Sequence, residues 1–499
     1  MLPTLDGLGP LHDQLYRWLR ASVLDGRLAA GERIPPSREM AAISGLSRNT
    51  VLHAYERLGA EGYVVCRRGA GTFVARGVVP AMPAPSRVPA DRSLRLSRFA
   101  QRARQGAPTL SAAWQRRSPS SRTAPYDFQY GEPMADRTAW QAWRRHLSRR
   151  AQDMPTTYPP VQGLLRLREA IADFLWRRRG MRVDAGRVLI VNGSQQALDL
   201  IARVLLDPGC TAALEDPGYP GARLAFAAAG ARLRGCPVDS QGLHSASLPA
   251  PQAQACLCYV TPSHQFPTGA LLPLARRLEL LDWAARNDAF VVEDDYDSDY
   301  CFLARPLQAV HALDAHDRVI YLASFAKVLT PALRLGYMVL PQRLVEPMLA
   351  AKFVSDRGCA LADQAALADF IENTDLDRHI RRTRNRLQRQ RDALLQALER
   401  AFGDGVQVMG AHAGMHVTVW FRDLPPPQVE ALCKAALASG VRAYPLQPYF
   451  MDGGHCSAIL LGYATLCEDA VEAGIHRLAQ AHQRLGHGAG VLSRRADIL

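Results

Sequence analysis

From about residue 126 onward, short apolar runs alternate along the chain with longer helical patterns. Most of these apolar runs end in Gly, Pro or Asp, as strands do where they enter a turn. Strands that alternate with helices favour a three-layer α/β domain with a largely parallel sheet. The chain has 499 residues, more than one hydrophobic core normally serves, so we expect two or more domains.

Three regions and a short tail differ in texture. Residues 1–75 alternate between helical patterns and turn signals. Residues 76–125 hold seven prolines and show little periodicity, so we expect an extended linker there. Residues 126–485 form the α/β region, and residues 486–499 form a C-terminal tail. The sequence contains no internal repeat.

The positive charge is concentrated in the linker. The formal net charge of the chain is +13, and residues 76–125 hold ten arginines against one acidic residue, Asp91. A basic segment beside a nucleic-acid-binding module suits a polyanionic partner. The alternative is a merely hydrophilic linker in a chain that prefers Arg throughout, since Lys occurs only at positions 327, 352 and 434.

The cysteines and the hydropathy of the chain indicate the cellular compartment to expect. The chain has ten cysteines, and its closest pair, Cys256 and Cys258, fits neither a zinc site nor a disulfide framework. We expect reduced thiols. Asp6 and His12 interrupt the first apolar residues, and no run of eighteen apolar residues predicts a membrane span. We therefore expect a cytoplasmic protein with no membrane partner and no metal.

The first 75 residues predict a helix-turn-helix followed by a wing. A short helix at 38–43, capped by Ser37, is joined by a Gly-containing turn to a second helix that Ser47 caps. The second helix would enter the major groove. Strands at 62–66 and 72–74 would form a wing with arginines at its tip. The expected DNA contacts are Arg38, Ser47, Arg48, Asn49, Thr50, Arg67, Arg68 and Gly69.

This stretch resembles the winged helix of the GntR superfamily, and the resemblance implies binding to double-stranded operator DNA. The alternative is a winged helix that binds protein. The matching residues are Leu28, Gly31, Leu46, Ser47, Arg48, Thr50, Val51, Ala54, Tyr55, Leu58, Glu61, Gly62, Tyr63, Gly69, Gly71, Thr72, Phe73 and Val74.

A lysine follows an apolar run at 319–322. Ser324 and Lys327 come directly after this run, and Arg334 follows seven residues later. A lysine so close to a buried strand end is costly unless it is neutralised or used. Burial would lower its pKa and make it an amine nucleophile that forms Schiff bases. Arg334 can bind a phosphate with two hydrogen bonds, and Ser324 can donate another.

A second apolar strand, at 289–292, ends in an acidic cluster. Ligands lie at the strand ends of open α/β sheets. A buried Asp294 can keep a pyridine nitrogen protonated, and the phenol of Tyr296 can hydrogen-bond a ring hydroxyl. For the remaining aspartates we expect a solvated acidic turn: Asp295, Asp297 and Asp299.

A third strand, at 188–191, leads through a glycine turn into a helix. Such a helix N-terminus binds anions through its backbone N–H groups. Gly193, Ser194 and Gln195 would therefore cradle a phosphate. Tyr219, which follows a Pro-Gly pair, can stack on a flat ring. Each of these features by itself also occurs in ordinary turns.

Together these pieces resemble the fold-type I, class I aminotransferases over roughly residues 126–485. The resemblance implies a three-layer α/β/α major domain with a smaller α+β C-terminal part. It implies pyridoxal 5′-phosphate as the cofactor, with Lys327 as the catalytic residue that forms the Schiff base. The implied cofactor-binding residues are Gly193, Ser194, Gln195, Tyr219, His264, Asp294, Tyr296, Ser324, Lys327, Arg334 and, from a partner subunit, Tyr158.

The sequence departs from that family at two places. Phe266 stands where the family has the asparagine of an Asn-Pro-Thr-Gly motif, so His264 or Gln265 substitutes for it, or no residue does. The family also keeps an arginine near the C-terminus for the substrate carboxylate, and residues 444–449 lack one, while Arg442 lies in an expected strand. We therefore expect little or no turnover of free amino acids.

The whole arrangement resembles the MocR family of bacterial regulators, whose members include the GabR, PdxR and TauR types. Residues 261–269 and 293–298 are similar to that family in particular. The resemblance implies a head-to-tail homodimer that binds pyridoxal phosphate, in some members an amino-compound effector, and operator DNA on the nucleoid. Vitamin B6 or amino acid and amine metabolism is the expected target. Our hypothesis is that chemistry at Lys327 alters domain closure, which the linker passes to the winged helices.

Two other functions remain open on the sequence. One is an active aminotransferase with an autoregulatory DNA-binding domain, which steady-state turnover would support. The other is a DNA-binding protein whose large domain only dimerises.

Overall fold

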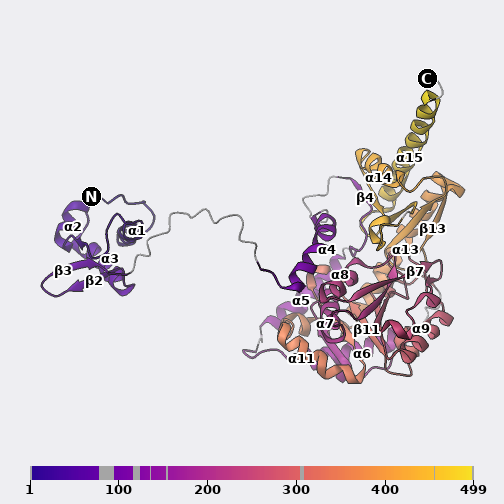
Figure 1. The fold of residues 1–499 in the computed structure, drawn as a ribbon, viewed down its shortest axis with the longest axis horizontal. Helices are drawn as coiled ribbons and strands as arrows, with labels where there is room; N and C mark the ends of the chain where they lie inside the picture. The colour runs from indigo at the N-terminus through magenta and orange to yellow at the C-terminus, as the bar shows by residue number, and fades with distance from the viewer. Residues whose placement is uncertain are drawn as a thin grey trace. The chain divides into compact units, whose positions relative to one another are not determined.

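The computed structural model describes residues 3–77, 95–115, 124–134, 136–152, 155–303, 308–454 and 456–496. The chain divides into two compact units, Met1–Arg95 and Leu96–Leu499. Both units are drawn in Figure 1.

The N-terminal unit is a winged helix-turn-helix, as predicted. Its core lies between the helices and one face of a small antiparallel sheet, and it includes Leu15, Leu19 and Val51. The sheet has the order β1-β3-β2. The elements are α1 (Leu11–Leu24), β1 (Arg33–Ile34), α2 (Ser37–Ser44), α3 (Arg48–Ala60), β2 (Val64–Arg67) and β3 (Gly71–Val74).

The caps of the two short helices differ from each other. Helix α2 begins at Ser37 and has Pro36 as its N-cap, with no side-chain cap, so the expectation that Ser37 caps this helix is wrong. Ser47 does cap α3, because its hydroxyl oxygen accepts a hydrogen bond from the Thr50 N–H at 3.2 Å. This bond satisfies one of the N–H groups that a helix start leaves free.

The C-terminal unit is built on an eight-stranded mixed sheet with the order β5-β12-β11-β10-β9-β6-β7-β8. β12 is antiparallel to both of its neighbours, while β11, β10, β9, β6 and β7 run parallel to one another. The strands are β5 (Val188–Val191), β6 (Thr211–Asp216), β7 (Arg232–Asp239), β8 (Gly242–Leu243), β9 (Ala255–Val260), β10 (Phe290–Asp295), β11 (Val319–Ser324) and β12 (Gly336–Val339).

Helices cover both faces of this sheet, because its central strands are apolar on both sides. Leu189 and Val191 of β5 face a core shared with α7 (Ser194–Leu205), α8 (Pro220–Ala229) and α11 (Val345–Ser355). The alternate residues face the other helix layer, which is formed by α6 (Leu165–Arg179), α9 (Leu274–Arg286) and α12 (Leu361–Glu372). The predicted three-layer α/β/α architecture is therefore confirmed.

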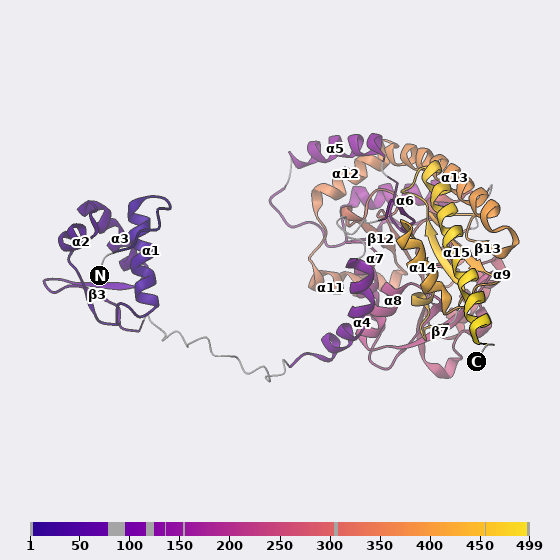
Figure 2. The same ribbon diagram turned by 90° about the horizontal axis from the view of Figure 1, so that it is seen from above.

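A smaller α+β part follows the large sheet. Its four-stranded antiparallel sheet has the order β13-β14-β17-β16. The long helices α13 and α15 run side by side (Figure 2). The elements are α13 (Asp375–Phe402), β13 (Val406–Met409), β14 (His416–Phe421), α14 (Gln428–Ala438), β15 (Val441–Arg442), β16 (Tyr444–Pro445), β17 (Ala458–Gly462) and α15 (Glu468–Ala496).

Parts of the expected linker and of the expected C-terminal tail are helical. Residues 98–115 of the expected extended linker form a helix, α4 (Arg98–Gln115), which lies beside α8 (Figure 2). Residues 78–94 and 116–123 of that linker lie outside the described residues. The expected tail is helical as far as Ala496 within α15. All ten cysteines are free, and no helix among the described residues is long and apolar enough to cross a membrane.

Candidate cofactor site and DNA-binding surface

The predicted cofactor residues gather at one edge of the large sheet. Gly193, Tyr219 and His264 follow β5, β6 and β9, and Asp294 and Ser324 lie at the ends of β10 and β11. These strands run in the same direction, so their carboxyl ends meet at this edge, where open α/β sheets bind ligands. Residues far apart in the sequence thus form one candidate site.

The phosphate turn, residues 193–195, opens helix α7. Gly193 is the N-cap at φ +81°, and a Cβ there would lie 3.1–3.2 Å from the guanidinium of Arg334. Arg334 lies against the turn because its Nη2 donates a hydrogen bond to the Asn192 carbonyl oxygen at 2.8 Å. The turn therefore combines backbone N–H groups, a helix N-terminus and a guanidinium, which together suit a phosphate.

Lys327 lies in the loop after β11. Its Nζ donates a hydrogen bond to the Gly131 carbonyl oxygen at 2.7 Å, so the amine of this half-buried side chain is held in place. Ser324, three residues earlier, accepts a hydrogen bond from the Ala326 N–H at 3.1 Å. The Ser324 hydroxyl hydrogen therefore remains able to donate to a phosphate.

Asp294 is buried at the end of β10, with 5% of its surface exposed. Its Oδ2 accepts a hydrogen bond from the Tyr259 hydroxyl at 2.7 Å, whereas its buried Oδ1 has no hydrogen-bond partner among the described residues. Burial raises the pKa of Asp294 to about 7, although the bond from Tyr259 lowers it. An orphaned carboxylate oxygen at this depth fits a protonated pyridine nitrogen.

Tyr219 lies at the start of α8 in an aromatic cluster. Its ring is stacked near that of Tyr259, with centroids 6.5 Å apart, and meets Phe266 edge-on at 5.9 Å. A Cβ at Gly221 would lie 2.5 Å from the Tyr219 ring, so glycine leaves room for this ring position. Phe266, which replaces the family asparagine, packs among aromatic rings and offers no polar group.

Tyr296 and His264 form a buried polar group next to that cluster. The Tyr296 hydroxyl donates to the His264 carbonyl oxygen at 2.9 Å, and His264 Nδ1 lies 2.8 Å from Asp297 Oδ2. The Gln265 amide is used elsewhere, since it donates to the Glu215 carboxylate and to the carbonyl oxygens of Pro217 and Phe266. Of the two residues considered as substitutes for the asparagine, His264 is thus the one that contacts Tyr296.

His264, Asp297 and His416 also place ligand-type atoms within 4.8 Å of one another. Both ring nitrogens of His264 already have partners, since Nε2 lies 3.2 Å from the Gly410 carbonyl oxygen. We therefore interpret this group as support for Tyr296.

The expectation of a solvated acidic turn is wrong. Asp295 is 6% exposed, and it pairs with Arg179 at 2.8 Å and accepts a hydrogen bond from Tyr321. Asp297 is buried against His264, and Asp299 is half-buried near Arg178. The segment looked solvent-exposed because the partners lie in other segments: the two arginines are more than 100 residues away and His264 is 33 residues away.

Tyr158 and Arg442, which the sequence analysis also considered, lie outside the cluster of candidate cofactor residues. The Tyr158 side chain is 78% exposed, and the Arg357 guanidinium lies 5.5 Å from its ring centroid. Arg442 does lie in a strand, β15, as expected, and its Nε is 3.6 Å from Asp127 Oδ2. Arg442 thus has an acidic neighbour already.

Sequence reasoning missed several partners of the site. Tyr259 and Gly131, which hold Asp294 and Lys327, sit in segments without a motif of their own. It also missed Lys352 and Asp356 at the end of α11, which contact Gln196, the residue directly after the phosphate turn. The scarcity of lysine in this chain was the available signal.

The N-terminal unit presents the predicted DNA-binding residues on its surface. Ser47, Arg48 and Asn49 at the start of α3 are exposed, Thr50 is half-buried, and Arg38 is exposed on α2. Arg67, Arg68 and Gly69 lie at the tip of the hairpin between β2 and β3, where Gly69 has φ +78°. Within residues 3–77, the ion pairs leave all four of these arginines without an acidic partner.

Two family descriptions match the chain. Residues 126–453 match the family described as aminotransferase class I and II. Residues 11–74 match the family described as bacterial regulatory proteins, gntR family. The two matches correspond to the two structural units.

The chain is similar to two bacterial regulators over nearly its whole length. The chain is 39% identical to the probable rhizopine catabolism regulatory protein MocR of Rhizobium meliloti, over 95% of this chain and 94% of that protein. It is 32% identical to the pyridoxine biosynthesis regulator PdxR of Corynebacterium glutamicum, over 92% and 93%. The C-terminal unit resembles the crystal structure of the α-aminoadipate aminotransferase LysN of Thermus thermophilus, with TM-score 0.67 and 29% identity, over 78% of this chain and 97% of that one.

Proposed function

The chain belongs to the MocR-type transcription regulators, and we propose that it binds pyridoxal phosphate and thereby controls its own binding to operator DNA. The observation that carries this proposal is a set of candidate cofactor residues gathered at one edge of the large sheet, on a chain that also carries a winged helix. A domain that only dimerises would not need the orphaned oxygen of buried Asp294 or the held amine of Lys327.

Each part of the cofactor has a candidate partner. Lys327 would hold it covalently through Nζ, Asp294 would hold the pyridine nitrogen, and Tyr219 would stack on the ring. The ring hydroxyl would meet Tyr296, which His264 supports. The phosphate would lie on residues 193–195, with Ser324 and Arg334. When bound, pyridoxal phosphate supplies an aldehyde that exchanges between amines and a ring that withdraws electrons.

The proposed effectors are pyridoxal phosphate itself and an amino compound that displaces Lys327. The resemblance to a regulator of pyridoxine biosynthesis supports a target in vitamin B6 or amine metabolism. A compound can shift the regulator between two states only through its different affinity for them.

A path for the signal runs through α8. This helix begins directly after Tyr219, the residue proposed to stack on the ring, and Gln195 of the phosphate turn donates to its Gly221 carbonyl oxygen at 3.3 Å. At its other end, Arg102 of α4 donates to the carbonyl oxygens of Ala228 and Ala229 at 2.9 and 3.2 Å. Movement at the cofactor would thus reach α4, which follows the segment that leads from the DNA-binding unit.

We also propose a head-to-tail homodimer in which Tyr158 reaches the partner's phosphate turn. Three exposed apolar side chains support this: Tyr158 is 78%, Val354 83% and Phe353 50% exposed. Arg357 lies over the rings of both Tyr158 and Phe353. Such a patch is typical of a protein interface.

The cofactor proposal is tested by the visible absorption spectrum of the purified protein beside that of Lys327→Ala. We expect a yellow band after addition of pyridoxal phosphate to the native chain and none in the variant. Arg334→Ala is the companion variant, which should keep the band but need more cofactor to saturate it. A chain that stays colourless in excess cofactor would contradict the proposal.

A further inference from the structure

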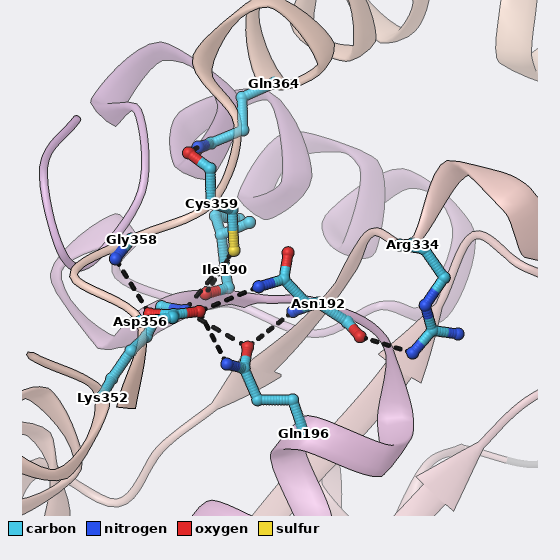
Figure 3. Close-up of polar contacts among 9 residues, drawn as sticks. All are labelled: Ile190, Asn192, Gln196, Arg334, Lys352, Asp356, Gly358, Cys359 and Gln364. Carbon is cyan, nitrogen blue, oxygen red and sulfur yellow. Dashed lines mark hydrogen bonds and ion pairs between the residues drawn. The ribbon is translucent and has the colours of Figure 1, made fainter. Parts of the chain in front are cut away.

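A buried lysine and an aspartate lie directly beside the phosphate turn (Figure 3). Lys352, in the last turn of α11, has no exposed surface. Its Nζ lies 2.8 Å from Oδ2 and 3.1 Å from Oδ1 of Asp356, so the two form an ion pair. The free-energy cost of moving two charges out of water is often larger than the gain from their attraction. We therefore expect a role of this ion pair other than stabilising the fold.

Asp356 binds both residues that bracket the turn. Asn192 Nδ2 and Gln196 Nε2 donate to Asp356 Oδ2 at 2.8 and 2.6 Å. Gln196 Oε1 in turn accepts from the Asn192 N–H at 2.7 Å and from Lys352 Nζ at 3.3 Å. The turn between these two residues, 193–195, is thus anchored at both ends by one carboxylate.

The same network reaches the guanidinium of the site. The Asn192 carbonyl oxygen accepts the hydrogen bond from Arg334, as Figure 3 shows. Burial raises the pKa of Asp356, but hydrogen bonds from Lys352 and Gln196 outweigh it, and the pKa lies below its ordinary value. Asp356 is therefore ionised at neutral pH, and its hydrogen bonds are charge-assisted and strong.

We propose that Asp356, with Lys352 as its counter-charge, is a positioning residue that sets the phosphate turn before the cofactor arrives. The proposal rests on the proposed function, since it assigns the turn to a phosphate. Asp356 acts only through Asn192 and Gln196, because a carboxylate would itself repel a phosphate. A turn that is already ordered saves the cost of ordering it on binding.

The test compares pyridoxal phosphate with pyridoxal, which lacks the phosphate. For Asp356→Asn we expect the Kd of pyridoxal phosphate to rise about tenfold or more, while that of pyridoxal stays unchanged. Absorbance titration of each protein measures both constants. The matched control is Asp369→Asn, which removes a different ion-paired carboxylate, one that pairs with Arg150 and Arg166. This variant should change neither constant.

Equal losses for both compounds, or no loss for either, would overturn the positioning role. If Asp356→Asn does not fold because Lys352 is left unpaired, Asn192→Ala removes one anchor and keeps the ion pair. This variant must show the same selective loss in a smaller degree, and an unchanged ratio of the two constants would also overturn the role. Native protein that binds neither compound contradicts the proposed function itself and the positioning role with it.

Discussion

At the scale of single residues, burial determines the protonation of Asp294. The carboxyl has one hydrogen-bond donor, Tyr259, for two oxygens, and burial raises its pKa to about 7. The charge of Lys327 lowers this pKa less than burial raises it, so the ionised side chain opposes folding. A protonated ring nitrogen beside Asp294 would supply a second cation and would offset this cost.

Asp294→Asn should therefore stabilise the cofactor-free protein in a pH-dependent way. The unfolded chain loses the Asp294 proton near the ordinary pKa of 3.8, and the folded protein keeps it until about 7. The folded state binds more protons between these values, so its stability falls as the pH rises through them. The gain in the free energy of unfolding should be larger at about pH 8 than at about pH 4, by about 1–4 kcal/mol.

Urea unfolding at the two pH values measures this difference. Asp239→Asn is the control, because hydrogen bonds from Arg276 lower the pKa of Asp239, so this variant should gain nothing at high pH. The same gain in both variants, or none in Asp294→Asn, contradicts the assignment. With cofactor present the sign reverses, and Asp294→Asn should bind pyridoxal phosphate more weakly.

Single residues were predictable where a motif surrounds them. The motif around Lys327 and the strand end at Asp294 could be read directly from the sequence. The partners of Asp295 and Asp297 could not, because Arg179 and His264 come from other segments of the chain. Pairing across such distances depends on topology, which local pattern does not encode.

At the scale of elements, helix α3 and the wing between β2 and β3 are expected to contact different parts of the DNA. A helix N-terminus in the major groove reads bases, whereas arginines at a wing tip meet the sugar-phosphate backbone or the minor groove. Arg68 is exposed, and Arg67 lies 5.1 Å from the Phe73 ring centroid. The two elements should therefore respond differently to mutation.

Replacement of both Arg67 and Arg68 by Ala should weaken binding to operator and random DNA alike. Loss of two phosphate contacts should reduce the slope of log K against log salt concentration by about 2. Asn49→Ala should instead lower affinity mainly for operator. Fluorescence anisotropy at several salt concentrations measures both effects. Arg27→Ala, which removes a charge paired with Asp25, is the control, and a loss as large in this variant would contradict the assignment.

Helix α4 is an element that the sequence pattern did not predict. Prolines and arginines in residues 76–125 indicated an extended chain, yet residues 98–115 form a helix. Its stability comes from packing on α8, where a Cβ at Gly106 would lie only 2.0 Å from Leu224 Cδ2. A helix that depends on a distant partner carries a weak local signal.

The whole molecule has to connect two units through the segment before α4. The sequence predicted both units, because each follows a familiar alternation of helices, strands and turns. The proposed connection between the candidate cofactor site and α4 could not be predicted, since it depends on hydrogen bonds between Arg102 and the end of α8.

Arg102→Ala should uncouple the two units. The Kd for pyridoxal phosphate and the Kd of the cofactor-free protein for DNA should stay as in the native chain. The change in DNA affinity that the cofactor causes should shrink, because α8 no longer bonds to α4 through this side chain. Arg104→Ala, on an exposed face of the same helix, is the control. An undiminished response in Arg102→Ala would rule out this path.

The central claim, that chemistry at Lys327 controls DNA binding, is tested most directly by one titration. A labelled DNA fragment selected by the protein from a random-sequence pool is titrated with native chain and with Lys327→Ala, each with and without pyridoxal phosphate. The account predicts a change in Kd of about fivefold or more for the native chain and no change for Lys327→Ala. A native chain whose DNA affinity ignores the cofactor, or a variant that responds as strongly, would contradict it.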